Sequence, residues 1–141
     1  MRIHIVLLLL VSGSLLSGQN TPQSARVYVQ KNFPGISATA AIDSLLVYSE
    51  RLGEEYPDSA FKLATFAIEL IGKKGKPGQL PQAAWCAAEA LYYLNEYKEA
   101  IDYYMSAAQE SYKITNDSNT LMAENLAGAA FCYQELGIYK K

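Results

Sequence analysis

The side chains that most often carry enzyme chemistry are scarce in this sequence. Its single histidine is His4, which lies in an apolar N-terminal run, so the rest of the chain has none. Without a histidine, Ser-His-Asp and Cys-His catalysis and most zinc sites are excluded there. The Glu54-Glu55 pair does not suit a glycosidase, because adjacent helix residues diverge by about 100°. No glycine-rich phosphate loop or nucleophile–base pair is visible, so we expect no enzyme activity, no metal and no cofactor.

The two cysteines can be interpreted in two ways. Cys86 and Cys132 both lie in apolar helical patterns, where a free cysteine packs as a small buried side chain. In an exported chain, an oxidising compartment could instead join them in a disulfide. The buried-thiol interpretation is the favoured one.

The first twenty residues, MRIHIVLLLLVSGSLLSGQN, are typical of a secretory signal peptide. Arg2 precedes an apolar stretch that reaches Leu16, which is shorter than the ~20 residues needed to span a bilayer. We expect cleavage near residue 19, with an uncleaved anchor as the alternative. Loss of residues 1–19 removes Arg2 and no acid, so the formal net charge changes from −2 to −3, which gives no bias toward nucleic acid. Residues 20–38 are expected to form an N-terminal lead.

From residue 39 onward, apolar residues recur at helical spacing, which predicts an all-α domain. Turn-forming residues interrupt the pattern between successive stripes. We expect Asp58 or Ser59 to cap the second helix, Gly72 to end it, and Gly137 to end the last helix. The expected helices span about 39–52, 59–71, 81–94, 98–114 and 120–136.

Two alanines recur at a similar interval. Ala60 is repeated as Ala100, 40 residues later, and Ala88 as Ala130 after 42 residues. Small side chains let antiparallel helices approach to about 8–9 Å, so these alanines are expected at helix crossings. Paired helices with a period of this length are typical of a solenoid. The expected repeats span 39–72, 80–115 and, incompletely, 120–141.

The stretch LNEYKEAIDYYMSAA resembles the heart of a tetratricopeptide (TPR) repeat. This resemblance implies an antiparallel helix-pair solenoid of about two and a half repeats. Ala88 and Ala130 stand where the family often has glycine, and Tyr112 replaces the proline that often closes the second helix, so that helix should run on for another turn. The residues that carry the resemblance are Ala88, Tyr97, Ala100, Tyr104 and Ala107, then Leu126, Ala130, Tyr133, Leu136, Gly137 and Tyr139.

The signal peptide and the opening Tyr-Pro-Asp-Ser-Ala at 56–60 restrict the resemblance to a smaller group of TPR proteins. The combination is similar to the exported N-terminal sensor region of Bacteroidetes-type TPR histidine kinases or LuxR-type regulators. This implies an exported protein, in the periplasm or cell envelope of a Gram-negative bacterium, that acts in signal transduction. The alternative is an envelope TPR scaffold without a signalling output. The third repeat stops after Tyr139-Lys140-Lys141, so we expect a fragment of a longer receptor, with self-association through the unfinished repeat as the alternative.

The resemblance also implies a ligand site. TPR solenoids bind protein or peptide segments on a concave face lined by the first helix of each repeat. On that pattern the groove residues are Gln82, Trp85, Glu89, Tyr92, Phe131 and Gln134, with Leu45, Ser49, Tyr93, Ala127 and Glu135 at further positions. The alternative for Trp85 and Phe131 is packing against neighbouring helices. No nucleic-acid partner is expected, and membrane contact is expected only through a missing C-terminal region or an uncleaved signal.

Overall fold

The computed structural model describes residues 31, 33–76, 78–115 and 119–137. These residues form helices and no strand, which confirms the expected all-α class. The signal peptide expected at 1–19 and most of the lead expected at 20–38 lie outside the described residues. The helices are α3 (Ala38–Leu52), α4 (Pro57–Lys74), α5 (Gln79–Tyr93), α6 (Tyr97–Thr115) and α7 (Thr120–Glu135).

The start and end of α4 differ from the prediction. The helix begins at Pro57 with Tyr56 as its N-cap and without a side-chain cap, so neither Asp58 nor Ser59 caps it. Proline suits the first helical position, because the N–H group that it lacks would have no partner there. Gly72 lies inside the helix, which ends two residues later and is capped by Gly75. One glycine in a helix costs only about 1 kcal/mol relative to alanine, which packing outweighs.

Short turns connect the later helices. The α5–α6 turn places Asn95 at φ 63°, and the N–H groups of Asn95 and Glu96 donate to carbonyls of the last turn of α5. This is the hydrogen-bond pattern of a Schellman motif. Asn119 caps α7 by accepting from the Met122 N–H at 2.9 Å, and Gly137, with φ 70°, follows that helix. Between α5 and α6 the chain therefore reverses direction within three residues.

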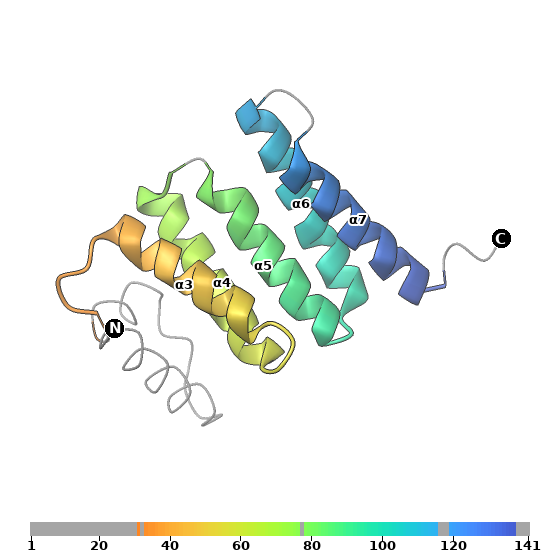
Figure 1. Ribbon diagram of the computed structural model, residues 1–141, viewed down its shortest axis with the longest axis horizontal. Coiled ribbons are helices and arrows are strands. Elements are labelled where there is room, and N and C mark those ends of the chain that lie inside the picture. Colours follow the sequence, from red (N-terminus) through yellow and green to blue (C-terminus); the bar gives the residue numbers. More distant parts are fainter. Residues whose placement is uncertain (1–30, 32, 77, 116–118, 138–141) are drawn as a thin grey trace.

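Each helix packs against the next, and the helices form two layers (Figure 1). α3, α5 and α7 lie in one layer, where α5 contacts both of the others. α4 and α6 lie behind them. None of the described helices is both long enough and apolar enough to cross a membrane. The outward sides of α3, α5 and α7 together form one face of the molecule, which is called the shared face below.

The core is built around small residues. Ala60, Ala88 and Ala100 are each 0% exposed, and Ala88 and Ala100 belong to the same buried cluster between α5, α6 and α7. A second cluster joins α3, α4 and α5, and the side chains of Phe61, Trp85 and Tyr103 pack against both clusters. The two clusters therefore form a continuous core.

The corresponding alanine on α7 has a different environment. Ala130 is exposed, whereas Ala129 beside it is buried against the core. Ala88 is covered by α6, the helix that follows it, and the described residues include no helix after α7. The Ala130 face of α7 is thus uncovered by any described residue.

Candidate functional site

A hollow of about 520 Å³ lies on the shared face of α3, α5 and α7. α3 contributes one residue to its wall, α5 contributes three, and α7 contributes five. The hollow is therefore a groove across three helices that lie side by side in one layer. Its lining residues are Glu50, Gln82, Trp85, Glu89, Leu121, Glu124, Ala127, Gly128 and Phe131.

The structure brings four of the six sequence-predicted site residues together. Gln82, Trp85 and Glu89 line the groove from α5 and Phe131 lines it from α7. The three α5 residues share one face of their helix because they are three or four positions apart, and the packing of α7 beside α5 brings Phe131 to the same groove. Whether these residues bind a ligand stays a prediction.

The other two predicted residues lie elsewhere. Tyr92 is half-buried, and its ring packs edge-on against those of Tyr93 and Tyr97 with centroids 5.8 and 5.6 Å away. Gln134 is exposed near the end of α7, outside the groove lining. Tyr92 belongs instead to an aromatic cluster with Tyr93 and Tyr97 near the α5–α6 turn. Gln134 lies three residues after Phe131, the last residue of α7 that lines the groove.

On α3 neither predicted residue lines the main groove. Leu45 and Ser49 are both buried. Ser49 lines only the smaller adjoining hollow, and its hydroxyl donates to the Ala60 carbonyl at 2.8 Å. Ser49 is the small residue at the α3–α4 contact, and the next residue points about 100° further round the helix. That residue is Glu50, which lines the groove and was missed.

Leu121, Glu124 and Gly128 are the missed groove residues on α7. Successive members of the series Leu121, Glu124, Gly128 and Phe131 are three or four positions apart, so they share one face of α7. The prediction transferred positions from α5 instead and omitted Glu124, which stands 42 residues after Gln82. Ala127, a further predicted position, does line the groove.

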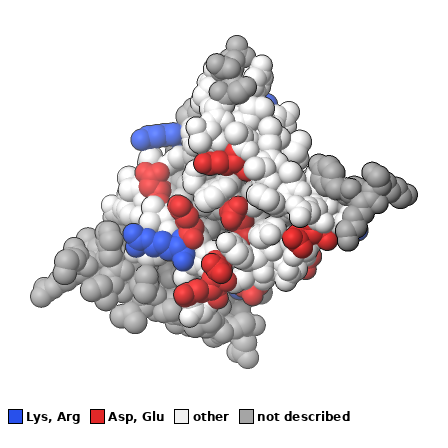
Figure 2. Space-filling view, turned by 45° about the vertical axis from the view of Figure 1, so that its right-hand side comes forward, with Lys and Arg blue, Asp and Glu red and all other residues white. Residues whose placement is uncertain are grey.

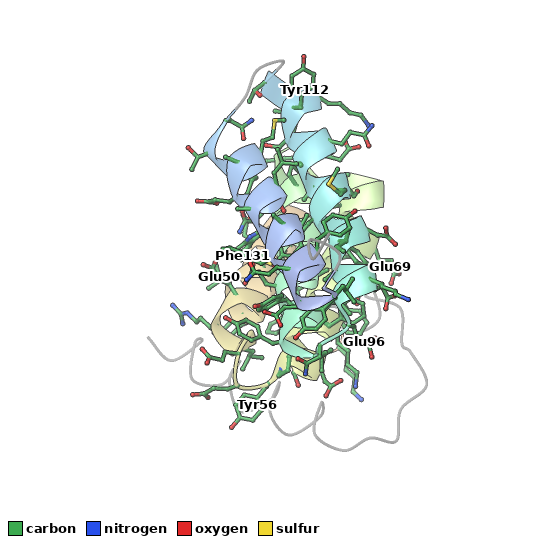
Figure 3. All side chains as sticks on the ribbon, turned by 90° about the vertical axis from the view of Figure 1, so that its right-hand side faces the viewer. Glu50, Tyr56, Glu69, Glu96, Tyr112 and Phe131 are labelled. Atoms are coloured by element: carbon green, nitrogen blue, oxygen red, sulfur yellow. The ribbon has the colours of Figure 1, made fainter. Side chains whose placement is uncertain are left out.

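Trp85 fits both of its interpretations, packing against neighbouring helices and lining the groove. Its side chain is partly buried and packs against both core clusters, and it also lines the groove. Phe131 is different, because 58% of it is exposed and it lines the groove without packing against either core cluster. Figure 3 shows Phe131 and Glu50 on the same side of the molecule, opposite Glu69 and Glu96.

The base of the groove is tied to the core through Glu89. The Tyr104 hydroxyl donates to Glu89 Oε1 at 2.5 Å, and Tyr104 is 1% exposed. Burial, and then the bond to Glu89, raise the pKa of the Tyr104 hydroxyl well above its usual range. Gly128 lies against the same ring, and a Cβ there would be 2.5 Å from two ring carbons. α6 and α7 can approach this closely only because residue 128 is a glycine.

Acidic groups dominate the electrostatics of this face. Glu50, Glu89 and Glu124 line the groove, and no Lys or Arg does. A smaller hollow of about 240 Å³ shares Glu50, Trp85 and Glu89 with it and adds Arg51 and Glu54, so its lining carries three acidic side chains and one basic one. Figure 2 shows acidic side chains gathered near the middle of the face in view, with fewer basic ones toward its left side.

The cysteines have the environment of buried side chains. Both are free and buried. Burial, and then the charge of Glu50, raise the pKa of the Cys86 thiol from 9.0 to about 12, and burial raises that of Cys132 to about 11. At neutral pH both are protonated thiols, which are poor nucleophiles. Within the described part of the chain, no three His, Cys, Asp or Glu side chains come together in a way that could hold a metal ion.

No protein-family model, curated protein or solved structure matches this chain.

Proposed function

We propose that this chain is a non-catalytic interaction module, a TPR-like helical solenoid that binds a protein or peptide segment in the groove of α3, α5 and α7. One observation carries the proposal. Alternate helices of a consecutive stack line a single groove, and two aromatic side chains, Trp85 and Phe131, form part of its wall. Concave surfaces of this kind arise in solenoids from the small rotation between successive helix pairs.

The exposure of Phe131 supports a binding role. A side chain that is 58% exposed gains little from folding, whereas full burial of a phenylalanine contributes about 1.5–3 kcal/mol. Anchoring aromatic residues surrounded by polar groups are typical of binding hot spots. Gln82, beside Trp85 on α5, supplies an amide that can hydrogen-bond to a ligand backbone.

A non-catalytic role is favoured by the chemistry of the groove. Its polar side chains are three carboxylates and one amide, and the two buried thiols have raised pKa values. The proposal therefore needs no covalent step and no cofactor. Binding through apolar contact and hydrogen bonds is sufficient.

We further propose that the module is the exported sensor part of a longer signalling receptor. The N-terminal signal pattern and the Tyr-Pro-Asp-Ser-Ala opening support this proposal. The second candidate is a cell-envelope scaffold without an output. Sequencing the gene beyond codon 141 separates the two. Further repeats followed by a membrane helix and a kinase or DNA-binding region support the receptor, and a stop without a membrane segment supports the scaffold.

The groove assignment is tested with a phage-displayed library of random twelve-residue peptides, selected on the full chain. We expect peptides that bind the wild type and lose at least about tenfold in affinity on Phe131→Ala. Tyr56→Ala is the matched control, because Tyr56 is 48% exposed and lies at the lower end of the view in Figure 3, away from Phe131 and outside the groove lining. Trp85→Ala should weaken binding more than it lowers the melting temperature. Equal binding to wild type and Phe131→Ala, or a collapse in stability on Trp85→Ala with unchanged affinity per folded molecule, would refute the assignment.

A further inference from the structure

The groove contains an uncompensated negative charge. Each of its three helices contributes one carboxylate, namely Glu50 from α3, Glu89 from α5 and Glu124 from α7. An ion pair outside the groove joins Lys113 to Glu110. Glu89 has a hydrogen bond from Tyr104 but no basic partner among the described side chains.

The carboxylates face a surface that is partly apolar. Trp85 and Phe131 provide aromatic groups, and Leu121 provides an aliphatic one. A lysine or arginine suits such a surface, because its aliphatic stem packs on apolar groups while its charged end reaches the carboxylates. The face of an indole also attracts cations. A neutral or acidic segment would leave the three carboxylates without compensation as water is displaced.

We propose that the groove selects a peptide segment in which a lysine or arginine stands next to an apolar side chain. This inference rests on the proposed binding function and specifies its ligand. The cation binds on the acidic lining that Glu50, Glu89 and Glu124 form, and the neighbouring apolar side chain lies on Phe131. The adjoining hollow shares Glu50 and Glu89 and adds Arg51 and Glu54, so its lining is also acidic but includes one basic side chain, which the main groove lacks.

The test uses the peptides selected by the full chain. Each is resynthesised with its lysine, with acetyl-lysine and with glutamate at the same position, and affinity is measured by the fluorescence of Trp85, the one tryptophan in the chain. We expect acetylation to weaken binding to the wild type by about tenfold, and glutamate to weaken it further. In the Glu50→Gln/Glu89→Gln/Glu124→Gln variant, acetylation should change the affinity by no more than about twofold.

A control of equal net charge separates the groove from general acidity. Glu55→Gln/Glu96→Gln/Glu99→Gln changes three exposed acids outside the groove lining and should retain the tenfold effect of acetylation. Glu50→Gln/Glu124→Gln leaves the Tyr104–Glu89 hydrogen bond untouched, so it provides a folded variant if the triple change unfolds the chain. In this double variant, acetylation of the peptide should weaken binding by much less than tenfold.

The outcomes distinguish the two proposals. Selected peptides that lack lysine and arginine, or that lose nothing on acetylation, overturn the cation preference and leave the binding function standing. An equal loss in the control variant shows that net charge alone attracts the peptides, which also overturns it. If the library yields no peptide that prefers the wild type to Phe131→Ala, the binding function and this inference both fail.

Discussion

The hydroxyl of Tyr104, on the buried side of α6, donates to Glu89 on α5 at 2.5 Å. Glu89 also lines the groove, so one hydrogen bond connects the core to the candidate binding surface. Gly128 of α7 lies against the ring of the same tyrosine. The positions of α5 and α7, two of the three helices that line the groove, therefore depend on their contacts with Tyr104 of α6.

Removing the Tyr104 hydroxyl should destabilise the fold. Tyr104→Phe deletes a hydrogen bond to a carboxylate, and such bonds contribute about 1.5–3 kcal/mol. We expect a lower urea midpoint with an unchanged slope. Tyr56→Phe, at an exposed position, is the control and should leave the midpoint unchanged. A Tyr104→Phe midpoint equal to that of the wild type would show that the bond contributes nothing.

Gly128→Ala and Gly72→Ala should have opposite effects. A Cβ at residue 128 would meet the buried ring of Tyr104 at 2.5 Å, whereas one at residue 72 would have no neighbour within 4 Å. The first change forces α7 away from α6, and overpacking of this kind costs about 1–3 kcal/mol. The second replaces a glycine inside α4 and should stabilise by about 0.5–1 kcal/mol. Thermal denaturation of the two variants measures both, and a destabilised Gly72→Ala together with a neutral Gly128→Ala would contradict the packing described.

The thiols should react slowly in the folded protein. The pKa of Cys86 is raised to about 12 and that of Cys132 to about 11, so little thiolate forms at pH 8, and the thiolate is the reacting species. Iodoacetamide at pH 8 should leave both cysteines unmodified in the native chain and label both in urea, as read by intact mass. Rapid labelling of either cysteine without denaturant would show that its thiol is accessible.

Stability should fall as the pH rises above about 9. In the unfolded chain a cysteine loses its proton near 9.0, whereas in the folded chain Cys86 and Cys132 keep theirs to about 12 and 11. Between these values the unfolded state binds fewer protons, so the free energy of unfolding decreases as the pH rises. Tyr104, whose pKa is raised above its ordinary value of 10.0, adds to the decrease at higher pH.

The measurement is urea denaturation from pH 8 to pH 11. Cys86→Ala/Cys132→Ala removes both thiols and should flatten the slope that begins near pH 9. The part of the slope that arises from Tyr104 should remain. A wild-type stability that is constant across this range, or that increases, would contradict the direction of the shifts.

The sequence could predict the helices because their stripes and turn residues are local. The starts expected at residues 81 and 120 lie within two residues of the observed starts of α5 at Gln79 and α7 at Thr120. The prediction that the second helix ends at Gly72 was wrong, because the free-energy cost of one glycine inside a helix is smaller than the stabilisation that α4 gains from packing. A helix end is thus decided partly by tertiary contacts that no local pattern records.

The site was predictable on one helix and less so on its neighbours. Gln82, Trp85 and Glu89 share a face of α5 by spacing alone. Which faces of α3 and α7 turn toward them depends on contacts between helices. The Ser49–Ala60 hydrogen bond orients α3 so that Glu50 lines the groove, and the contact of Gly128 with Tyr104 orients α7. Such long-range contacts set rotations that the spacing of residues leaves open.

The stepwise packing of the helices has a mechanical consequence. α3 and α7 form opposite walls of the groove, yet the extensive contacts of each are with its chain neighbours and with α5, and none joins the two directly. The width of the groove therefore depends on how α3 and α7 are each tilted relative to α5. A bound ligand could widen or narrow the groove by bending the stack of helices, while the contacts between adjacent helices are kept.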